Sequence, residues 1–236
     1  MSKKLNHNQP SLNTGLAIAI GEFKDTQAIN KFGYNSAVGN SAWETVWDGN
    51  NEYTYIDTAG TAVVTSDDSD DNGGTVLVSG LDANYDEVEE TLTIGGGAGS
   101  VEFYRVHRAQ MVTANTGNVN QGNITITVDT KTAAKITEQI GQTLMAVYTV
   151  PRTKTAYLIQ IDAGASKDLE HEIRFVTKTN GGVWNTKSYH TQRGGFNALV
   201  FEVPIHIPAE ADVEIKVKAS ATSAVSAGFE LILVDA

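Results

Sequence analysis

The residues best suited to chemistry form an acidic run, Asp67-Asp68-Ser69-Asp70-Asp71-Asn72-Gly73. From Asp68 to Gly73 it matches the opening of a calcium-binding loop, D-x-[DN]-x-[DN]-G, in which carboxylate and amide oxygens hold the ion. The pattern also needs a closing acid, which would fall at Ser79, and flanking helices, which the sequence does not predict. Calcium binding therefore stays an open alternative. We favour a solvated acidic loop between two strands, kept open by repulsion among its carboxylates.

Histidines are the next candidates, as metal ligands or as a general base. The chain has His7, His107, His171, His190 and His206. No two of them form an H-x-H or H-x-x-E-H pair. His171 and His206 fall in alternating strand patterns, where a period of two accounts for a histidine without any metal. We therefore predict no metal site.

Catalytic arrangements are absent from the sequence. The chain has no cysteine and no serine in a G-x-S-x-G motif, so neither a thiol nucleophile nor a serine hydrolase is supported. Glu89 and Glu90 are neighbours on a predicted strand and so point to opposite faces, which is unsuitable for a shared acid–base site. The glycines of 95–99 precede a strand instead of a helix, which indicates a hairpin tip and no phosphate loop. We predict a protein that is not an enzyme, with no catalytic or cofactor-binding residues and no cofactor.

Aromatic side chains could instead stack on sugar rings. The candidates are Trp43, Trp47, Tyr53, Tyr55 and Trp184. Trp43 and Trp47 are four residues apart, so on a strand both would point to one face. Two large rings on one face form core more often than a binding platform, because their burial is strongly stabilising. We predict that 29–48 is the junction where the chain enters its β-body, with both tryptophans buried there.

Composition indicates a globular chain with an acidic surface. Its 236 residues are 41% apolar and 19% charged, and 17 Lys and Arg against 28 Asp and Glu give a formal charge of −11. Phosphate binding depends on clustered cations, so we expect neither nucleic acid nor an anionic membrane as a partner. The apolar run Gly15–Gly21 is too short to span a bilayer and lacks a signal-peptide cleavage pattern. The lack of cysteine excludes disulfides, and we expect synthesis in a reducing cytoplasm.

Alternating segments separated by glycine and asparagine predict an all-β fold, an antiparallel β-sandwich or jelly-roll-like body. The predicted strands are 75–78, 87–94, 101–106, 124–128, 143–150, 156–161, 172–178, 184–190, 198–207, 213–218 and 229–234. The Asn180-Gly181 step predicts a hairpin turn. Residues 131–140 could form a turn or two of helix, although three β-branched residues weaken that signal.

The leader, residues 1–28, is predicted to be an extended N-terminal arm, with Leu16–Ile20 as a short strand or peg. Such an arm could dock on a neighbouring subunit or be a mobile terminus. Residues 29–236 form the β-sandwich body. Its length allows one domain or two β sub-domains, 29–130 and 131–236.

Six segments together carry a family resemblance. They are Ile29–Asn35, Glu44–Gly49, Tyr53–Tyr55, Val78–Tyr85, Phe103–Ala109 and Gly141–Pro151. In this order they resemble a group of virion structural proteins of tailed bacteriophages, especially marine phages and cyanophages. The resemblance covers most of 29–236 and leaves out the leader and the acidic loop.

The resemblance implies a non-enzymatic virion component, assembled in the host cytoplasm. We expect a capsid-associated decoration or head protein, docked on the capsid shell as a homo-oligomer, with the major capsid protein or other virion proteins as partners. A tail or fibre-base protein is the first alternative, and a carbohydrate-binding β-sandwich module that contacts the host surface is the second. A depolymerase would need a pair of acids in a groove, for which the sequence has no motif.

Overall fold

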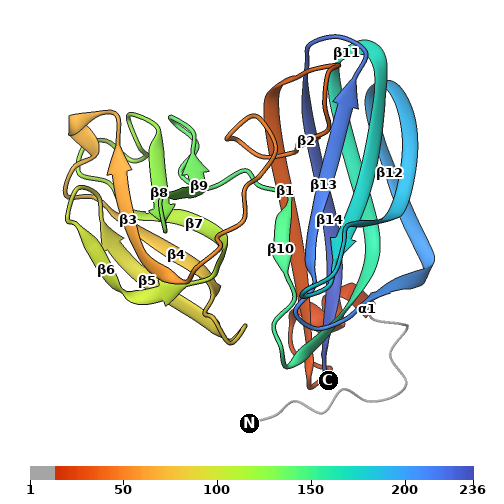
Figure 1. Ribbon diagram of the computed structural model, residues 1–236, viewed down its shortest axis with the longest axis horizontal. Coiled ribbons are helices and arrows are strands. Elements are labelled where there is room, and N and C mark those ends of the chain that lie inside the picture. Colours follow the sequence, from red (N-terminus) through yellow and green to blue (C-terminus); the bar gives the residue numbers. More distant parts are fainter. Residues whose placement is uncertain (1–13) are drawn as a thin grey trace.

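The computed structural model describes residues 14–236, in which antiparallel strands form nearly all of the regular structure (Figure 1). This confirms the predicted all-β fold. The strands gather into two bodies that lie side by side, a larger one built on a seven-stranded sheet and a smaller one built on two shorter sheets. Each body has its own cluster of buried apolar side chains.

The larger body is one sheet with the order β1-β14-β11-β13-β10. Its strands are β1 (Thr26–Val38), β14 (Ser223–Asp235), β11 (Lys154–Lys178), β13 (Asp212–Ala219) and β10 (Val147–Thr149), with β12 (Asn185–Ile207) paired to β11 and β2 (Glu44–Thr45) paired to β13. The first part of β11 pairs with β14 and its second part with β13. Because β11 changes partner along its length, the sheet folds over on itself and encloses a core.

That core follows from the alternating pattern of the strands. Buried and more exposed residues alternate along most of β14 and along parts of β11, as a period of two requires. Phe175 and Phe229 meet at its centre, with ring centroids 5.3 Å apart and planes at 81°. Both rings are fully buried, in the edge-to-face arrangement that aromatic pairs favour.

The smaller body consists of a four-stranded and a three-stranded sheet. The first has the order β6 (Ala98–Phe103), β3 (Gly60–Ser66), β8 (Ile124–Val128), β9 (Lys131–Ile136), and the second β5 (Glu87–Thr93), β4 (Thr75–Leu81), β7 (Arg105–Thr113). A single turn of 3-10 helix, η1 (Ser69–Asp71), lies between β3 and β4. The chain thus starts the larger body, builds the smaller one from 60 to 136, and then returns. Independent folding of two sub-domains stays a prediction, although the proposed boundary at 130/131 falls between the paired strands β8 and β9.

Two local predictions for the smaller body are wrong. Of residues 131–140, proposed as a turn or two of helix, 131–136 form β9 and pair with β8. The β-branched Thr132 and Ile136 suit a strand, and pairing outweighed the weak helix signal. The 95–99 glycines do form a turn, with positive φ at Gly95 and Gly97. It is not a hairpin tip, because β5 and β6 belong to different sheets.

The leader is also structured differently from the prediction. Thr14–Ala19 forms the short helix α1 instead of a strand, and its residues Ala17 and Ile18 are buried. Strand β1 begins at Thr26, within the range assigned to the arm, and pairs with β14 along its length. In Figure 1, α1 lies at the end of the larger body where the C-terminus also lies. The rest of the proposed arm, residues 1–13, falls outside the described residues.

No helix between residues 14 and 236 has the length and apolar character needed to span a membrane.

Candidate functional site

The acidic loop uses its carboxylates to hold itself in place. Asp71 is buried, and its carboxylate accepts hydrogen bonds from Ser66 Oγ at 2.6 Å and from the backbone N–H groups of Gln121 and Gly122 at 2.7 and 2.9 Å. Asp67 accepts two from Asn123, which hold the pKa of its carboxyl below the usual value. The expected solvated loop is therefore only partly correct. Within residues 14–236, no group of three or more His, Cys, Asp or Glu is placed to hold a metal.

The histidines occupy separate structural positions. His107 lies half-buried between the two bodies and accepts a hydrogen bond from the backbone N–H of Thr149 at 3.2 Å. His171 is buried on β11, with Nδ1 2.7 Å from the carbonyl oxygen of Leu169. His190 and His206 lie on β12. His7 falls outside the described residues.

The two tryptophans of the predicted junction are in different places. Trp47 is buried in the core of the smaller body, with 4% of its surface exposed, and donates from Nε1 to Asn51 O at 3.1 Å. This confirms its predicted burial. Trp43 is only half-buried, and the prediction that both rings share one strand face is wrong. Strand β2 covers only Glu44–Thr45, so the backbone turns on both sides of it and the indoles separate.

A chain of aromatic rings leads from the smaller core to the surface of the larger sheet. Trp47, Tyr53, Tyr55 and Trp184 follow one another, with successive ring centroids 5.1, 5.0 and 5.7 Å apart. Tyr53 also donates its hydroxyl to Ala133 O at 2.9 Å, which ties the chain to β9. Most of the sugar-stacking candidates are therefore packed against one another, and Trp184 ends the series at the outer face.

Trp43 and Trp184 line one groove, although 140 residues separate them in sequence. We call this the aromatic groove; its volume is about 490 Å³, and it is lined by Ala42, Trp43, Glu52, Arg174, Val176, Trp184, Thr186 and Lys216. Sheet register builds its floor, because Arg174 of β11 lies directly opposite Tyr189 of β12 on one side and Lys216 of β13 on the other. Side chains opposite each other in antiparallel strands point to the same face.

The groove combines ring faces with cations. The guanidinium carbon of Arg174 lies 3.6 Å from the ring centroid of Trp43 and 5.3 Å from that of Tyr189. The Nζ atoms of Lys216 and Lys178 lie 5.4 and 6.0 Å from the Trp184 ring. Aromatic rings beside ammonium and guanidinium groups suit a ligand that has both a flat apolar face and negative charge.

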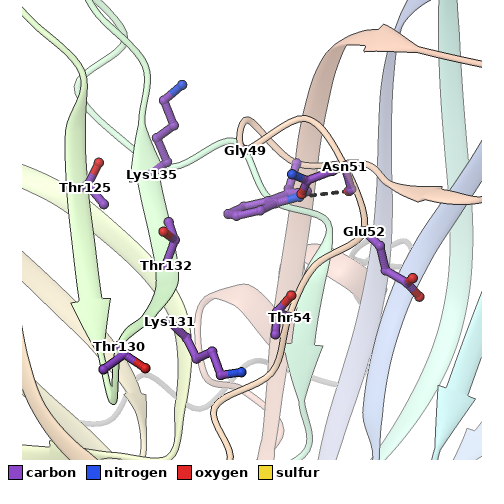
Figure 2. Close-up of a pocket in the computed structure, with 10 residues that line it drawn as sticks. Gly49, Asn51, Glu52, Thr54, Thr125, Thr130, Lys131, Thr132 and Lys135 are labelled. Carbon is purple, nitrogen blue, oxygen red and sulfur yellow. Dashed lines mark hydrogen bonds between the residues drawn. The ribbon is translucent and has the colours of Figure 1, made fainter.

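A second cavity, of about 570 Å³, separates the 49–54 segment from strands β8 and β9 (Figure 2). Thr125, Thr132, Lys131 and Lys135 line one wall, while Glu52 on the other side points away from the cavity. That carboxylate reaches Lys216 instead, at 2.5 Å. Its threonines and lysines offer hydroxyl and ammonium groups.

A buried ion pair joins the two bodies. Arg105 of β7 donates from Nε and Nη2 to the two carboxylate oxygens of Asp212 on β13, at 2.8 and 3.1 Å. Thr149 Oγ1 donates to the same carboxylate at 2.6 Å. The guanidinium also donates to Tyr104 O at 2.8 Å and lies 4.1 Å from the centre of the Tyr104 ring. Its donors are therefore directed to both bodies at once, which fixes their relative placement.

Asp48 is a buried acid at the same junction. Its Oδ2 accepts a weak hydrogen bond from Leu144 N at 3.4 Å, and its Oδ1 has no partner among the described residues. Burial raises the pKa of this carboxyl to about 7, although the charge of Lys135 opposes the rise. The folded chain therefore holds comparable amounts of protonated and charged Asp48 near pH 7.

We expect Asp48→Asn to be more stable than the wild type at pH 8, with a difference that shrinks as the pH falls. The folded carboxyl takes up its proton near pH 7, whereas the unfolded one does so only near its ordinary pKa of 3.8. The free energy of unfolding of the wild type therefore rises as the pH falls from 7 towards 4, because the folded state takes up a proton there. Above pH 7 the wild type bears the full cost of burying the Asp48 charge. Urea unfolding of both proteins from pH 5 to 8 measures this. A difference independent of pH would contradict it.

Strand β12 forms a long free edge. The strand is 23 residues long, and within the described residues it pairs with β11 alone, with three breaks in register. Three large apolar side chains on it are mostly exposed, Phe196 at 72%, Val200 at 64% and Val203 at 82%. Pro204 lacks an N–H donor, and proline within sheets is confined to such edges. An exposed apolar edge strand is a template for pairing with another chain.

No family model matches the chain, and no curated protein matches it. Among solved structures, similar chains come from infectious bursal disease virus. Its T=1 particle is 11% identical with a TM-score of 0.28 over 90% of this chain and 70% of that chain. The chain from the Gx strain is 8% identical with a TM-score of 0.27, over 89% of this chain and 72% of that chain. The chain from the VP2 subviral particle is 11% identical with a TM-score of 0.22, over 90% of this chain and 73% of that chain. This weak likeness is to proteins of a viral particle and does not single out bacteriophages; at such scores it assigns the chain neither family nor function.

Proposed function

We propose that the chain is a non-enzymatic structural component of a tailed-bacteriophage virion, a decoration or head protein that docks on the capsid shell. The resemblance of segments such as Gly141–Pro151 to phage virion proteins supports the kind of particle. The observation that carries the proposal is the free edge of β12 with its exposed apolar side chains. An isolated chain leaves this edge in water, whereas an assembled one buries it.

The β12 edge suits a homo-oligomer. Residues 194–201 (GGFNALVF) contain no charged side chain, so two copies can approach there without like charges meeting. Antiparallel pairing of β12 with a second copy would continue the sheet across a two-fold axis. Repeated copies would then strengthen weak individual contacts with the shell through effective concentration.

The proposal predicts that the purified chain is an oligomer whose stability depends on β12. We expect light scattering after size exclusion to give a mass that is a multiple of 25.2 kDa. Phe196→Asp with Val203→Asp should shift the protein to the monomer, because charges at an apolar edge block its pairing. The control is Val112→Asp, another exposed apolar residue, on β7 outside this edge. A wild-type monomer at all accessible concentrations would refute assembly through β12.

Location in the particle is tested separately. Antibodies against the recombinant chain should label the heads of purified virions in electron micrographs. Labelling confined to the tail would support the tail or fibre-base alternative. If purified virions lack the protein although the recombinant chain forms the expected oligomer, the virion role itself is refuted.

A further inference from the structure

Arg174 differs from the other arginines of the chain in having no polar partner among residues 14–236. All five arginines lie within the described residues, and four of them bind oxygen atoms: Arg105 binds Asp212, Arg108 binds Asn30 O, Arg152 binds Asp86 and Arg193 binds Asp168. Arg174 makes no hydrogen bond or ion pair with any residue from 14 to 236, and its buried Nε is unsatisfied. Its guanidinium lies against the rings of Trp43 and Tyr189.

The unsatisfied Nε of Arg174 is costly to bury unless something binds it. Leaving buried donors without acceptors costs about 1–3 kcal/mol, and more for a charged group. Stacking on indole recovers only part of this, about 0.5–2 kcal/mol. The planar fork of an arginine fits a carboxylate or sulfate in two parallel hydrogen bonds. An anion that enters the groove would therefore supply the missing acceptors.

Two lysines beside Trp184 reinforce this preference, Lys216 in the lining of the groove and Lys178 next to it. Lys178 makes no ion pair within the described part of the chain and lies beside Trp184. Lys216 is different, because Glu52 and Glu214 offset its charge, the latter at 3.5 Å. Arg174 and Lys178 thus form no ion pair within the described residues, although Glu172 lies nearby, where it accepts a hydrogen bond from the Tyr189 hydroxyl. Two cations without ion-pair partners attract an anionic ligand to this face.

We propose that the aromatic groove binds an anionic carbohydrate, a chain of sugar rings that carries carboxylate or sulfate groups. Arg174 binds the anionic group in two parallel hydrogen bonds. Trp184 stacks on the apolar face of a sugar ring, while Trp43 supports the guanidinium, which already covers one face of its indole. Lys178 lies close enough to Trp184 to meet a second charge on the sugar chain. This inference does not depend on where the protein sits in a particle.

Fluorescence titration tests the proposal, because Trp43 and Trp184 line the groove whereas Trp47 is buried elsewhere. The probes are polygalacturonate for carboxylates, dextran sulfate for sulfates and unmodified dextran as the neutral polymer. At physiological salt we expect saturable quenching by at least one polyanion and none by dextran. The two polyanions distinguish which anionic group is preferred. No saturable quenching by either, or equal quenching by dextran, would overturn the proposal.

Variants separate a specific site from general attraction to polyanions. Arg174→Gln should weaken binding by about 10- to 100-fold, the range expected for losing hydrogen bonds to a charged group. Arg193→Gln, which removes an exposed arginine on β12 outside the groove, should leave the affinity within about twofold. Equal losses in both variants would overturn the proposal. If Arg174→Gln fails to fold, Trp184→Leu and Lys178→Gln are measured instead. Unchanged affinity in both of these variants would overturn the proposal.

Discussion

Replacing Arg105 by methionine is expected to lower the free energy of unfolding by about 3–5 kcal/mol, the usual cost of leaving a buried charge without its partner. The Asp212 carboxylate would keep only the hydrogen bond from Thr149 at 2.6 Å, in an environment from which water is excluded. Both bodies should be affected, because the pair joins β7 of one to β13 of the other. Urea or guanidinium unfolding, followed by tryptophan fluorescence and circular dichroism, measures the loss.

Two comparisons show whether burial is the cause. Arg152→Met removes an arginine with a similar carboxylate partner, Asp86, but about half of each side chain is exposed. Its cost should stay below about 1 kcal/mol. The double variant Arg105→Met with Asp212→Leu should recover most of the stability, because apolar replacement of a whole buried pair is often neutral or better. If Arg105→Met cost no more than Arg152→Met, the buried junction described here would be wrong.

Phe229→Ala is expected to destabilise the larger body by about 3–5 kcal/mol, through lost apolar burial and the cavity left beside Phe175. The ring is fully buried, and its edge-to-face partner lies 5.3 Å away. Partial collapse of the surrounding side chains sets where in that range the value falls. Guanidinium denaturation, monitored in the far ultraviolet, measures the change.

Phe196→Ala is the matched control, since it removes the same atoms from a side chain that is 72% exposed in the isolated chain. In the monomer its effect should stay within about 0.5 kcal/mol. Measurements at low protein concentration are needed, because in an oligomer built on β12 the same ring would be buried. Equal effects of the two substitutions in the monomer would contradict the position assigned to Phe229.

Alternation in the sequence determined the fold class, because a strand buried on one face must repeat every two residues. The prediction that 229–234 is a strand is correct for this reason, and β14 alternates between buried and exposed residues there. The sequence failed where both faces of a strand are exposed. It split 184–190 from 198–207, which are one strand, β12, since side chains on a free edge face no core that would select a pattern. Strand β1 was missed for a related reason, because its first residues are mostly exposed.

The pairing and register of strands far apart in the sequence determined the candidate site. The sequence predicted that Trp47 is buried, and it is, because an indole surrounded by apolar neighbours is stabilised by burial wherever the chain turns. It placed Trp43 beside Trp47, whereas the structure places it on Arg174, 131 residues away. No local pattern encodes that contact, since it depends on which strands pair and in which register. Tertiary structure alone therefore brought Trp43, Arg174 and Trp184 to one groove and left the buried Nε of Arg174 without an acceptor among residues 14–236.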